Sequence, residues 1–279
     1  MEIENADFER ISSGVKKSKD RTTEKPFRLT ERDVELLKFI YEQKFATLDL
    51  LYFRFFDKRA KAVDAVPENL WVTRQRVAVL RRAGLLQSQM VYTESKAIYL
   101  LTQLGYQVLK SKRELLHYAD PVQQVDFRYF EHDKRISYCR TALERSAKCY
   151  LWFPERTLRA KRRFEIDGKQ FLVPSDAMPD GVFLSSKQER IAFELEFTPK
   201  KRERYAEKYR KYLGLLDTPI KRIGGDGPYG YTEALFHRVV IVACTDRIGK
   251  DLQEFFRNEA FSIMSYEKLI GGTLGVRAL

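Results

Sequence analysis

The chain has 279 residues, of which 44% are hydrophobic, 13% aromatic and 32% charged, enough for two globular domains and too apolar for an intrinsically disordered protein. Its 51 Lys and Arg residues against 39 Asp and Glu residues give a net charge of +12, which favours a polyanionic partner. No apolar run approaches the roughly 20 residues that cross a bilayer, and the polar N-terminus lacks a secretory signal, so we expect a cytoplasmic protein without a membrane partner.

Residues 1–27 mix both charge signs without an apolar period and are expected to form a flexible charged arm. Residues 28–113 are expected to form a domain of their own. Its first helix begins at a capping-box pattern, Thr30-Glu31-Arg32-Asp33. Thr47 precedes Leu48, Leu51 and Phe55 at helical spacing, which predicts a short second helix.

A third helix is expected from about Thr73, which would cap it, to Gly84, with Val77 and Leu80 facing the core. Its outward face is then basic and carries an amide. Arg and Gln side chains form paired hydrogen bonds with guanine and adenine in the major groove, although such a face is also common on solvated helices. The residues expected to contact DNA are Thr73, Arg74, Gln75, Ala78, Arg81 and Arg82 on this helix and Lys58, Arg59, Lys61 and Lys96 outside it.

Two short alternating segments follow, residues 85–90 and 97–101, and predict a β-hairpin. A fourth helix is expected from Thr102 to about Lys112. Three helices followed by a hairpin in this order are typical of a winged helix-turn-helix, so double-stranded DNA is the expected partner. Winged helices also dock proteins, which keeps an adaptor role open.

Residues 114–133, which include Pro121, are expected to be a linker, and residues 134–279 a second α/β domain. The whole chain is thus predicted to be α+β. The second domain is predicted to have helices at residues 134–148, 201–216 and 250–258 and strands at residues 150–158, 171–173 with 178–184, 191–197 and 238–244.

Carboxylates are the candidate catalytic groups of this domain. Residues 191–197 alternate strictly, so Glu194 and Glu196 lie on one face of a strand, and Asp180 lies at the end of another. Asp180 and Glu194 could together hold Mg²⁺ or Mn²⁺, which prefer carboxylate oxygen, whereas no other cofactor is indicated. A solvated or salt-bridged sheet face is the alternative.

The αβββαβ order, with Pro179-Asp180 and Glu194-Leu195-Glu196, resembles the PD-(D/E)XK restriction-endonuclease-like fold over roughly residues 134–244. The resemblance implies a lysine two residues after the second acid, where this chain has Glu196. It also implies that a lysine from the next helix can substitute, for which Lys208 is the candidate. An additional acid would come from Glu144 or Glu155. Both an Mg- or Mn-dependent DNA endonuclease and a fold that has lost catalysis are open.

The motifs Arg81-Arg82-Ala83-Gly84-Leu85, Glu131-His132-Asp133 and Pro179-Asp180-Gly181, with Glu194-Leu195-Glu196, resemble the replication-relaxation family of plasmid and mobile-element proteins. The resemblance implies a sequence-specific DNA-binding accessory protein in replication, transfer or transcription control. We expect it to be non-catalytic, with a metal-dependent nuclease and a protein-interaction adaptor as alternatives. A replication or transfer protein could be a partner, and the oligomeric state, including a dimer, is open.

Overall fold

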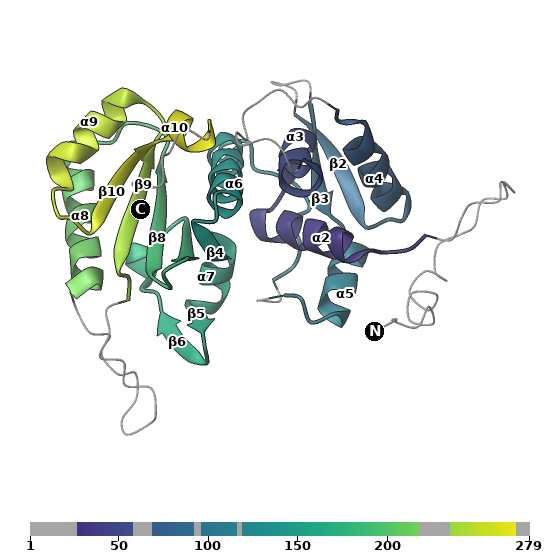
Figure 1. Cartoon of the computed structure of the whole chain (residues 1–279), viewed down its shortest axis with the longest axis horizontal. Coiled ribbons are helices and arrows are strands. Elements are labelled where there is room, and N and C mark those ends of the chain that lie inside the picture. Colours follow the sequence, from purple (N-terminus) through teal and green to yellow (C-terminus); the bar gives the residue numbers. More distant parts are fainter. Residues whose placement is uncertain (1–26, 58–68, 92–95, 116–118, 218–234, 272–279) are drawn as a thin grey trace, which may run out of the picture.

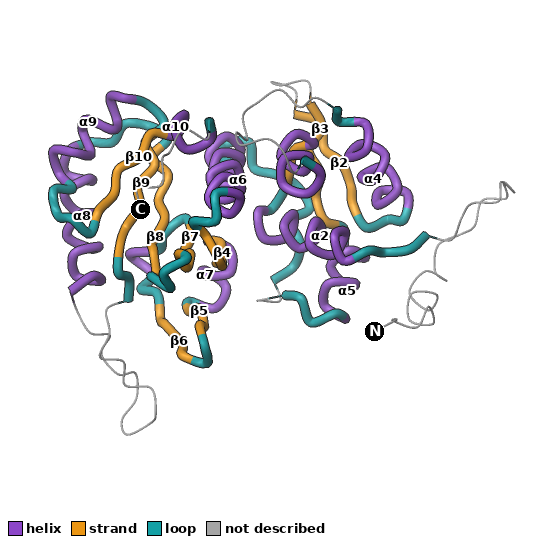
Figure 2. Tube along the Cα trace, viewed as in Figure 1, coloured by secondary structure: helices purple, strands orange, loops and turns teal. Residues whose placement is uncertain are grey.

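A computed structural model describes residues 27–57, 69–91, 96–115, 119–217 and 235–271 (Figure 1). The described chain is mixed α and β, with helices and several sheets arranged in two halves (Figure 2). The expected N-terminal arm lies outside the described residues except for Phe27.

The N-terminal half combines helices with a three-stranded antiparallel sheet of order β1-β3-β2. Its elements are α2 (Glu31–Gln43), β1 (Ala46–Thr47), α3 (Leu48–Leu51), a π-helical turn η1 (Tyr52–Phe56), α4 (Trp71–Arg82), β2 (Leu86–Val91), β3 (Lys96–Leu101) and α5 (Gln103–Ser111). Strand β1 was not expected, because two residues are too few for a period.

The capping box expected at the start of α2 is confirmed. The Thr30 hydroxyl accepts a hydrogen bond from the Asp33 amide, and the Asp33 carboxylate accepts one from the Thr30 amide at 2.8 Å. The Thr47 and Thr102 hydroxyls cap α3 and α5 by accepting hydrogen bonds from the amides of Leu50 and Gly105, without a reciprocal bond. Gly84 has a φ of 74°, a left-handed conformation that ends α4 and that residues with a Cβ rarely adopt.

The C-terminal half is built on a five-stranded sheet of order β10-β9-β8-β7-β4, in which β4, β7 and β8 are antiparallel and β8, β9 and β10 parallel. Its elements are α6 (Phe130–Arg145), β4 (Cys149–Pro154), α7 (Glu155–Lys161), the hairpin β5 (Arg163–Ile166) and β6 (Lys169–Leu172), a 3-10 turn η2 (Ser175–Ala177), β7 (Gly181–Ser185), β8 (Arg190–Glu196), α8 (Arg202–Asp217), β9 (Arg238–Ala243), α9 (Asp246–Phe255), β10 (Phe261–Ser265) and α10 (Tyr266–Ile270).

Helices cover both faces of this sheet, so its central strands are buried on both sides. α6 and α10 pack on the face that carries Phe183, Phe193 and Leu195. α8 and α9 pack on the opposite face, against Ala192 and Ile241 (Figure 1). Every residue of β8 is buried, including both glutamates, which therefore require partners inside the fold.

Several expected boundaries were wrong. The helix expected over residues 134–148 begins at Phe130, which stacks on Phe45, and ends before Ala147, which is exposed. The strand expected over residues 150–158 ends at Pro154, because Pro has no amide for a sheet ladder and suits a helix start, and α7 follows. The last expected helix begins at Asp246 rather than at residue 250, capped by Thr245. The strand expected over residues 171–173 overlaps β6, and the one expected over residues 178–184 corresponds to β7, whereas β5, β10 and α10 were not expected.

α6 joins the two halves. The helix lies between them (Figure 1). Phe53 of η1 belongs to the apolar cluster formed with Cys139 and Leu143 of α6. Beside it, the buried guanidinium of Arg140 lies 2.7 Å from the Glu42 carboxylate of α2. An apolar contact and a buried ion pair across the same boundary hold the halves in one orientation.

Candidate functional site

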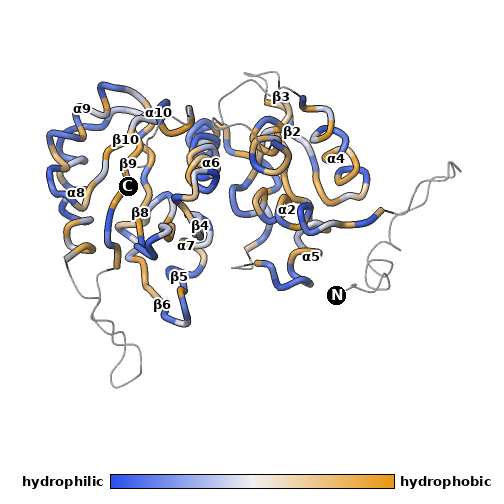
Figure 3. The backbone as a smooth tube through the Cα atoms, in the orientation of Figure 1, coloured by the Kyte–Doolittle hydropathy of each residue, from blue (hydrophilic) through white to orange (hydrophobic). Residues whose placement is uncertain are grey.

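The outward face of α4 is the first candidate site. Val77 and Leu80 are buried, as their spacing predicts, and Thr73 is buried as well. Hydrophilic and hydrophobic segments alternate along the helix (Figure 3). On the opposite side Arg74, Gln75, Arg81 and Arg82 are exposed and Ala78 is half-buried. The helix thus presents the basic and amide groups that were expected on its surface.

Thr73 does not have the expected role. α4 begins at Trp71, whose amide donates to the Asn69 side chain at 2.9 Å, so Thr73 is inside the first turn rather than at its cap. The Thr73 side chain is fully buried, and its hydroxyl has no hydrogen-bond partner among the described residues. The prediction of a cap was wrong because the helix starts two residues earlier. Because the Thr73 side chain is buried, it is not exposed for the expected DNA contact.

Arg76 was not singled out from the sequence, yet it anchors α4. Its Nε donates to Asp33 of α2 at 2.7 Å, and a second guanidinium nitrogen contacts the same carboxylate. Burial alone would raise the pKa of Asp33, but hydrogen bonds from Arg76 and Thr30 hold it below its usual value. This buried carboxylate fixes the rotation of α4 and therefore which of its side chains face outward.

The expected phosphate contacts outside α4 are only partly described. Lys96, at the start of β3, is exposed and lies 3.3 Å from the Asp49 carboxylate, a surface pair of small energetic value. Lys58, Arg59 and Lys61 lie outside the described residues.

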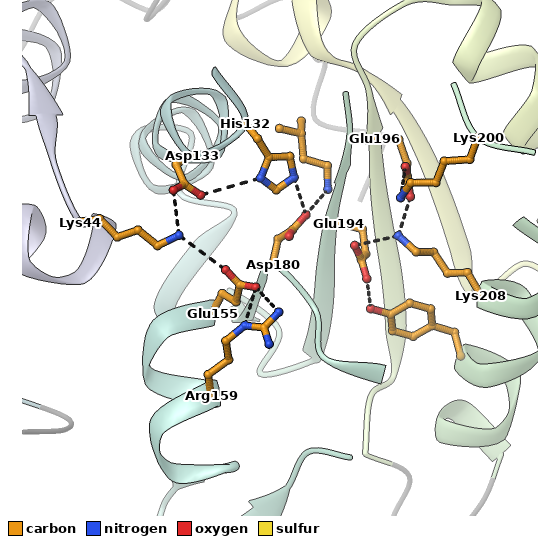
Figure 4. Close-up of polar contacts among 12 residues, drawn as sticks. Lys44, His132, Asp133, Glu155, Arg159, Asp180, Glu194, Glu196, Lys200 and Lys208 are labelled. Atoms are coloured by element: carbon orange, nitrogen blue, oxygen red, sulfur yellow. Dashed lines mark hydrogen bonds and ion pairs between the residues drawn. The ribbon is translucent and has the colours of Figure 1, made fainter. Parts of the chain in front are cut away.

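The second candidate site is a buried cluster of carboxylates around Lys208 (Figure 4). Lys208 Nζ donates to Glu194 at 2.9 Å and to Glu196 at 2.5 Å, and the Tyr212 hydroxyl donates to Glu194. Burial alone would lower the pKa of Lys208, but the two carboxylates raise it above its usual value. The structure therefore brings Glu194, Glu196 and Lys208 together, as expected, and adds Lys200, whose ammonium lies 2.6 Å from Glu196.

Asp180 lies next to this cluster and has partners of its own (Figure 4). Its carboxylate accepts a hydrogen bond from the Leu195 amide at 2.8 Å and lies 3.5 Å from His132 Nε2. Burial would favour the neutral imidazole, but the carboxylates of Asp133 and Asp180 raise the pKa of His132 to about 10. The sequence did not indicate this ion pair, because its members are far apart in the chain.

The residues of this cluster do not fit a metal ion well. Among the residues that the structure describes, no group of three or more His, Cys, Asp or Glu side chains is arranged to bind a metal. The ammonium of Lys208 lies between the Glu194 and Glu196 carboxylates, and Asp180 is already bonded to a backbone amide. Protein donors thus occupy oxygens that Mg²⁺ or Mn²⁺ would need.

The two acids considered as further ligands are engaged elsewhere. Glu144 pairs with Arg54 and, at 2.9 Å, with Arg140, at the boundary between the halves. Glu155 pairs with Arg159 at 2.7 Å and lies 3.8 Å from Lys44. Both carboxylates form ion pairs with cationic side chains near the boundary.

An open pocket of about 420 Å³ lies over Glu194 and Tyr212, between α8 and η2. Its wall carries charges of both signs. The lining cations are Lys200, Arg204, Lys208 and Lys211, against the acids Asp176, Glu194 and Glu207.

No protein-family model matches the chain, and neither a curated protein nor a solved structure matches it. In the part of the chain that the structure describes, none of the helices combines the length and the apolar character needed to cross a membrane.

Proposed function

We propose that the protein binds double-stranded DNA in a sequence-specific manner through α4 and does not cut it. The observation that carries the proposal is the outward face of α4, where Arg74, Gln75, Arg81 and Arg82 are exposed opposite the buried Val77 and Leu80. Guanidinium and amide groups on one helix face match the hydrogen-bonding edges of guanine and adenine. The net charge of +12 supplies the attraction to phosphate.

The arrangement around α4 supports a winged helix-turn-helix. α2, α3 with η1, and α4 are followed by the antiparallel hairpin β2–β3, and β1 adds a third strand. In proteins of this architecture the third helix enters the major groove and the hairpin lies beside it. Lys96, at the start of the second hairpin strand, is then placed for a phosphate contact.

The second half supports an endonuclease-like framework that serves binding rather than catalysis. α6, β4, β7, β8, α8 and β9 follow the αβββαβ order, with α7 and the β5–β6 hairpin inserted after β4. The ammonium of Lys208 pairs with both glutamates, and Lys200 pairs with Glu196, so protein cations occupy the positions beside these carboxylates. We place the protein, on the resemblance to the replication-relaxation family, among DNA-binding accessories of plasmids or other mobile elements.

The salt dependence of DNA binding tests the proposal. Binding sites should first be selected from random duplexes, and the affinity of the selected site should then be measured by fluorescence anisotropy. With about four phosphate contacts, we expect affinity to fall roughly 100-fold between about 50 mM and about 200 mM salt. Failure to retain any duplex at low salt would overturn the proposal and favour the adaptor role.

A metal-dependent nuclease is the second candidate, because Asp180, Glu194, Glu196 and Lys208 lie in one cluster. Supercoiled plasmid incubated with the protein and Mg²⁺ or Mn²⁺ should remain supercoiled. Cutting that is lost in Asp180→Asn, while DNA binding is kept, would establish the nuclease and refute the non-catalytic proposal.

A further inference from the structure

The first two residues of α4 have exposed apolar side chains. Trp71 is 62% exposed and Val72 is 49% exposed. A tryptophan on the surface of a helix leaves a large apolar area in water. Adjacent exposed apolar side chains of this size are typical of contact sites. Neither residue was among the expected DNA contacts, because the helix was expected to begin after them.

The helical period places these side chains on the face proposed to meet DNA. Trp71, Gln75, Ala78 and Arg82 follow each other at spacings of four, three and four residues, so they form one row along the outward side. Val72 lies on one flank of this row and Arg74 on the other. The apolar groups are therefore concentrated in the first turn, whereas Arg81 and Arg82 lie in the last turn.

The chemistry of the major groove identifies the group that this first turn would contact. The N-terminal residues of a recognition helix are those that reach the base edges. On these edges the C5 methyl of thymine is the apolar group, and every other recognition feature is a hydrogen-bond donor or acceptor. Gln75, one turn further along the same row, carries the amide that pairs with adenine.

We propose that Trp71 and Val72 contact thymine methyl groups, so that the first turn of α4 selects A·T base pairs within the target site. The inference rests on the proposed DNA-binding function and adds to it the base type that this part of the helix recognises. The exposed arginines of α4 attract the polyanionic duplex to the surface that carries the apolar pair. This charge favours DNA over an uncharged protein groove as the partner that covers Trp71 and Val72.

Uracil substitution tests the inference without changing the protein. In the selected duplex, each thymine is replaced in turn by uracil, which removes the methyl group and keeps the hydrogen-bonding edge. We expect the affinity of the wild-type protein to fall roughly fourfold at one or two positions, the effect of exposing one buried methyl group. In the Trp71→Ala, Val72→Ala double variant the uracil penalty should disappear. Tyr150→Ala removes a 75% exposed aromatic from β4 and should leave the penalty unchanged.

A second measurement keeps the test valid if the double variant folds poorly. The chain has two tryptophans, and Trp152 is 2% exposed, so acrylamide quenching of the wild-type fluorescence reports mainly Trp71. The selected duplex should reduce this quenching at least about twofold, because a buried indole is shielded from the quencher.

The possible outcomes distinguish failure of the thymine-methyl contact from failure of the proposed DNA binding. Equal affinity for thymine and uracil duplexes, with sequence-specific binding retained, overturns the methyl contact and leaves the DNA-binding proposal standing. A uracil penalty that persists in the double variant assigns the contact to another residue and also overturns it. Absence of sequence-specific binding overturns the proposed function itself.

Discussion

The outward face of α4 and the cluster around Lys208 both carry several charged or polar groups, but they differ in what those groups contact. On α4, Arg74 and Gln75 are exposed to solvent. In the cluster, Glu194 and Glu196 are buried and bonded to Lys208 and Tyr212. Exposed donors are available to a partner, whereas buried groups that satisfy one another mainly stabilise the fold. Charge in a sequence therefore indicates a binding site only once its partners are known.

Removal of Lys208 should have the largest effect. Lys208→Met leaves the buried Glu194 carboxylate without a cation and leaves Glu196 with Lys200 alone, and we expect the free energy of unfolding to fall by about 3–5 kcal/mol. Urea denaturation measures this change. Lys187→Met, at an exposed position between β7 and β8, should change stability by less than about 0.5 kcal/mol. Similar small effects in both variants would show that the cluster is not structural.

The His132–Asp180 pair should make stability depend on alkaline pH. The pKa of His132 is raised from 6.5 to about 10 in the folded protein, so the folded state holds a proton that the unfolded state releases. The contribution is fully present below about pH 6.5 and is lost as the pH rises to about 10. We expect the wild-type advantage over His132→Gln to shrink by on the order of 2 kcal/mol between these limits. A difference that stays constant with pH would contradict the ion pair.

Replacement of exposed side chains on α4 should leave stability intact and change DNA affinity. Arg74→Ala and Gln75→Ala should each weaken binding by about 1–3 kcal/mol and relax the preference at one base pair. Selection of binding sites with each variant measures the relaxation. A uniform loss across all sequences would instead identify a phosphate contact.

The smallest effect should come from Thr73. Its buried hydroxyl has no partner among the described residues, so Thr73→Val removes an unsatisfied polar group and keeps the shape. We expect a gain of about 1 kcal/mol in stability, measured by urea denaturation, with unchanged DNA affinity. A loss of affinity would show that Thr73 contacts DNA.

Much of the local structure could be predicted from the sequence, because its signals are short-range. Thr30, Thr47, Thr102 and Gly84 end or begin helices through bonds to neighbours three or four residues away. The alternation in β8 likewise placed Glu194 and Glu196 on one face. Elements without such a pattern were missed, namely the two-residue β1, the short strand β5 and the segment after α9.

The sequence by itself determined where α2, α3 and α5 begin and which side of α4 is polar, since backbone bonds and helical periodicity act within a few residues. Only the tertiary structure decided which charged side chains form ion pairs or hydrogen bonds inside the fold. Arg76 meets Asp33, His132 meets Asp180 and Lys208 meets two glutamates across 12 to 48 positions of the chain. Such pairs form because packing of helices and strands brings distant side chains within hydrogen-bond distance, and no local spacing encodes that approach.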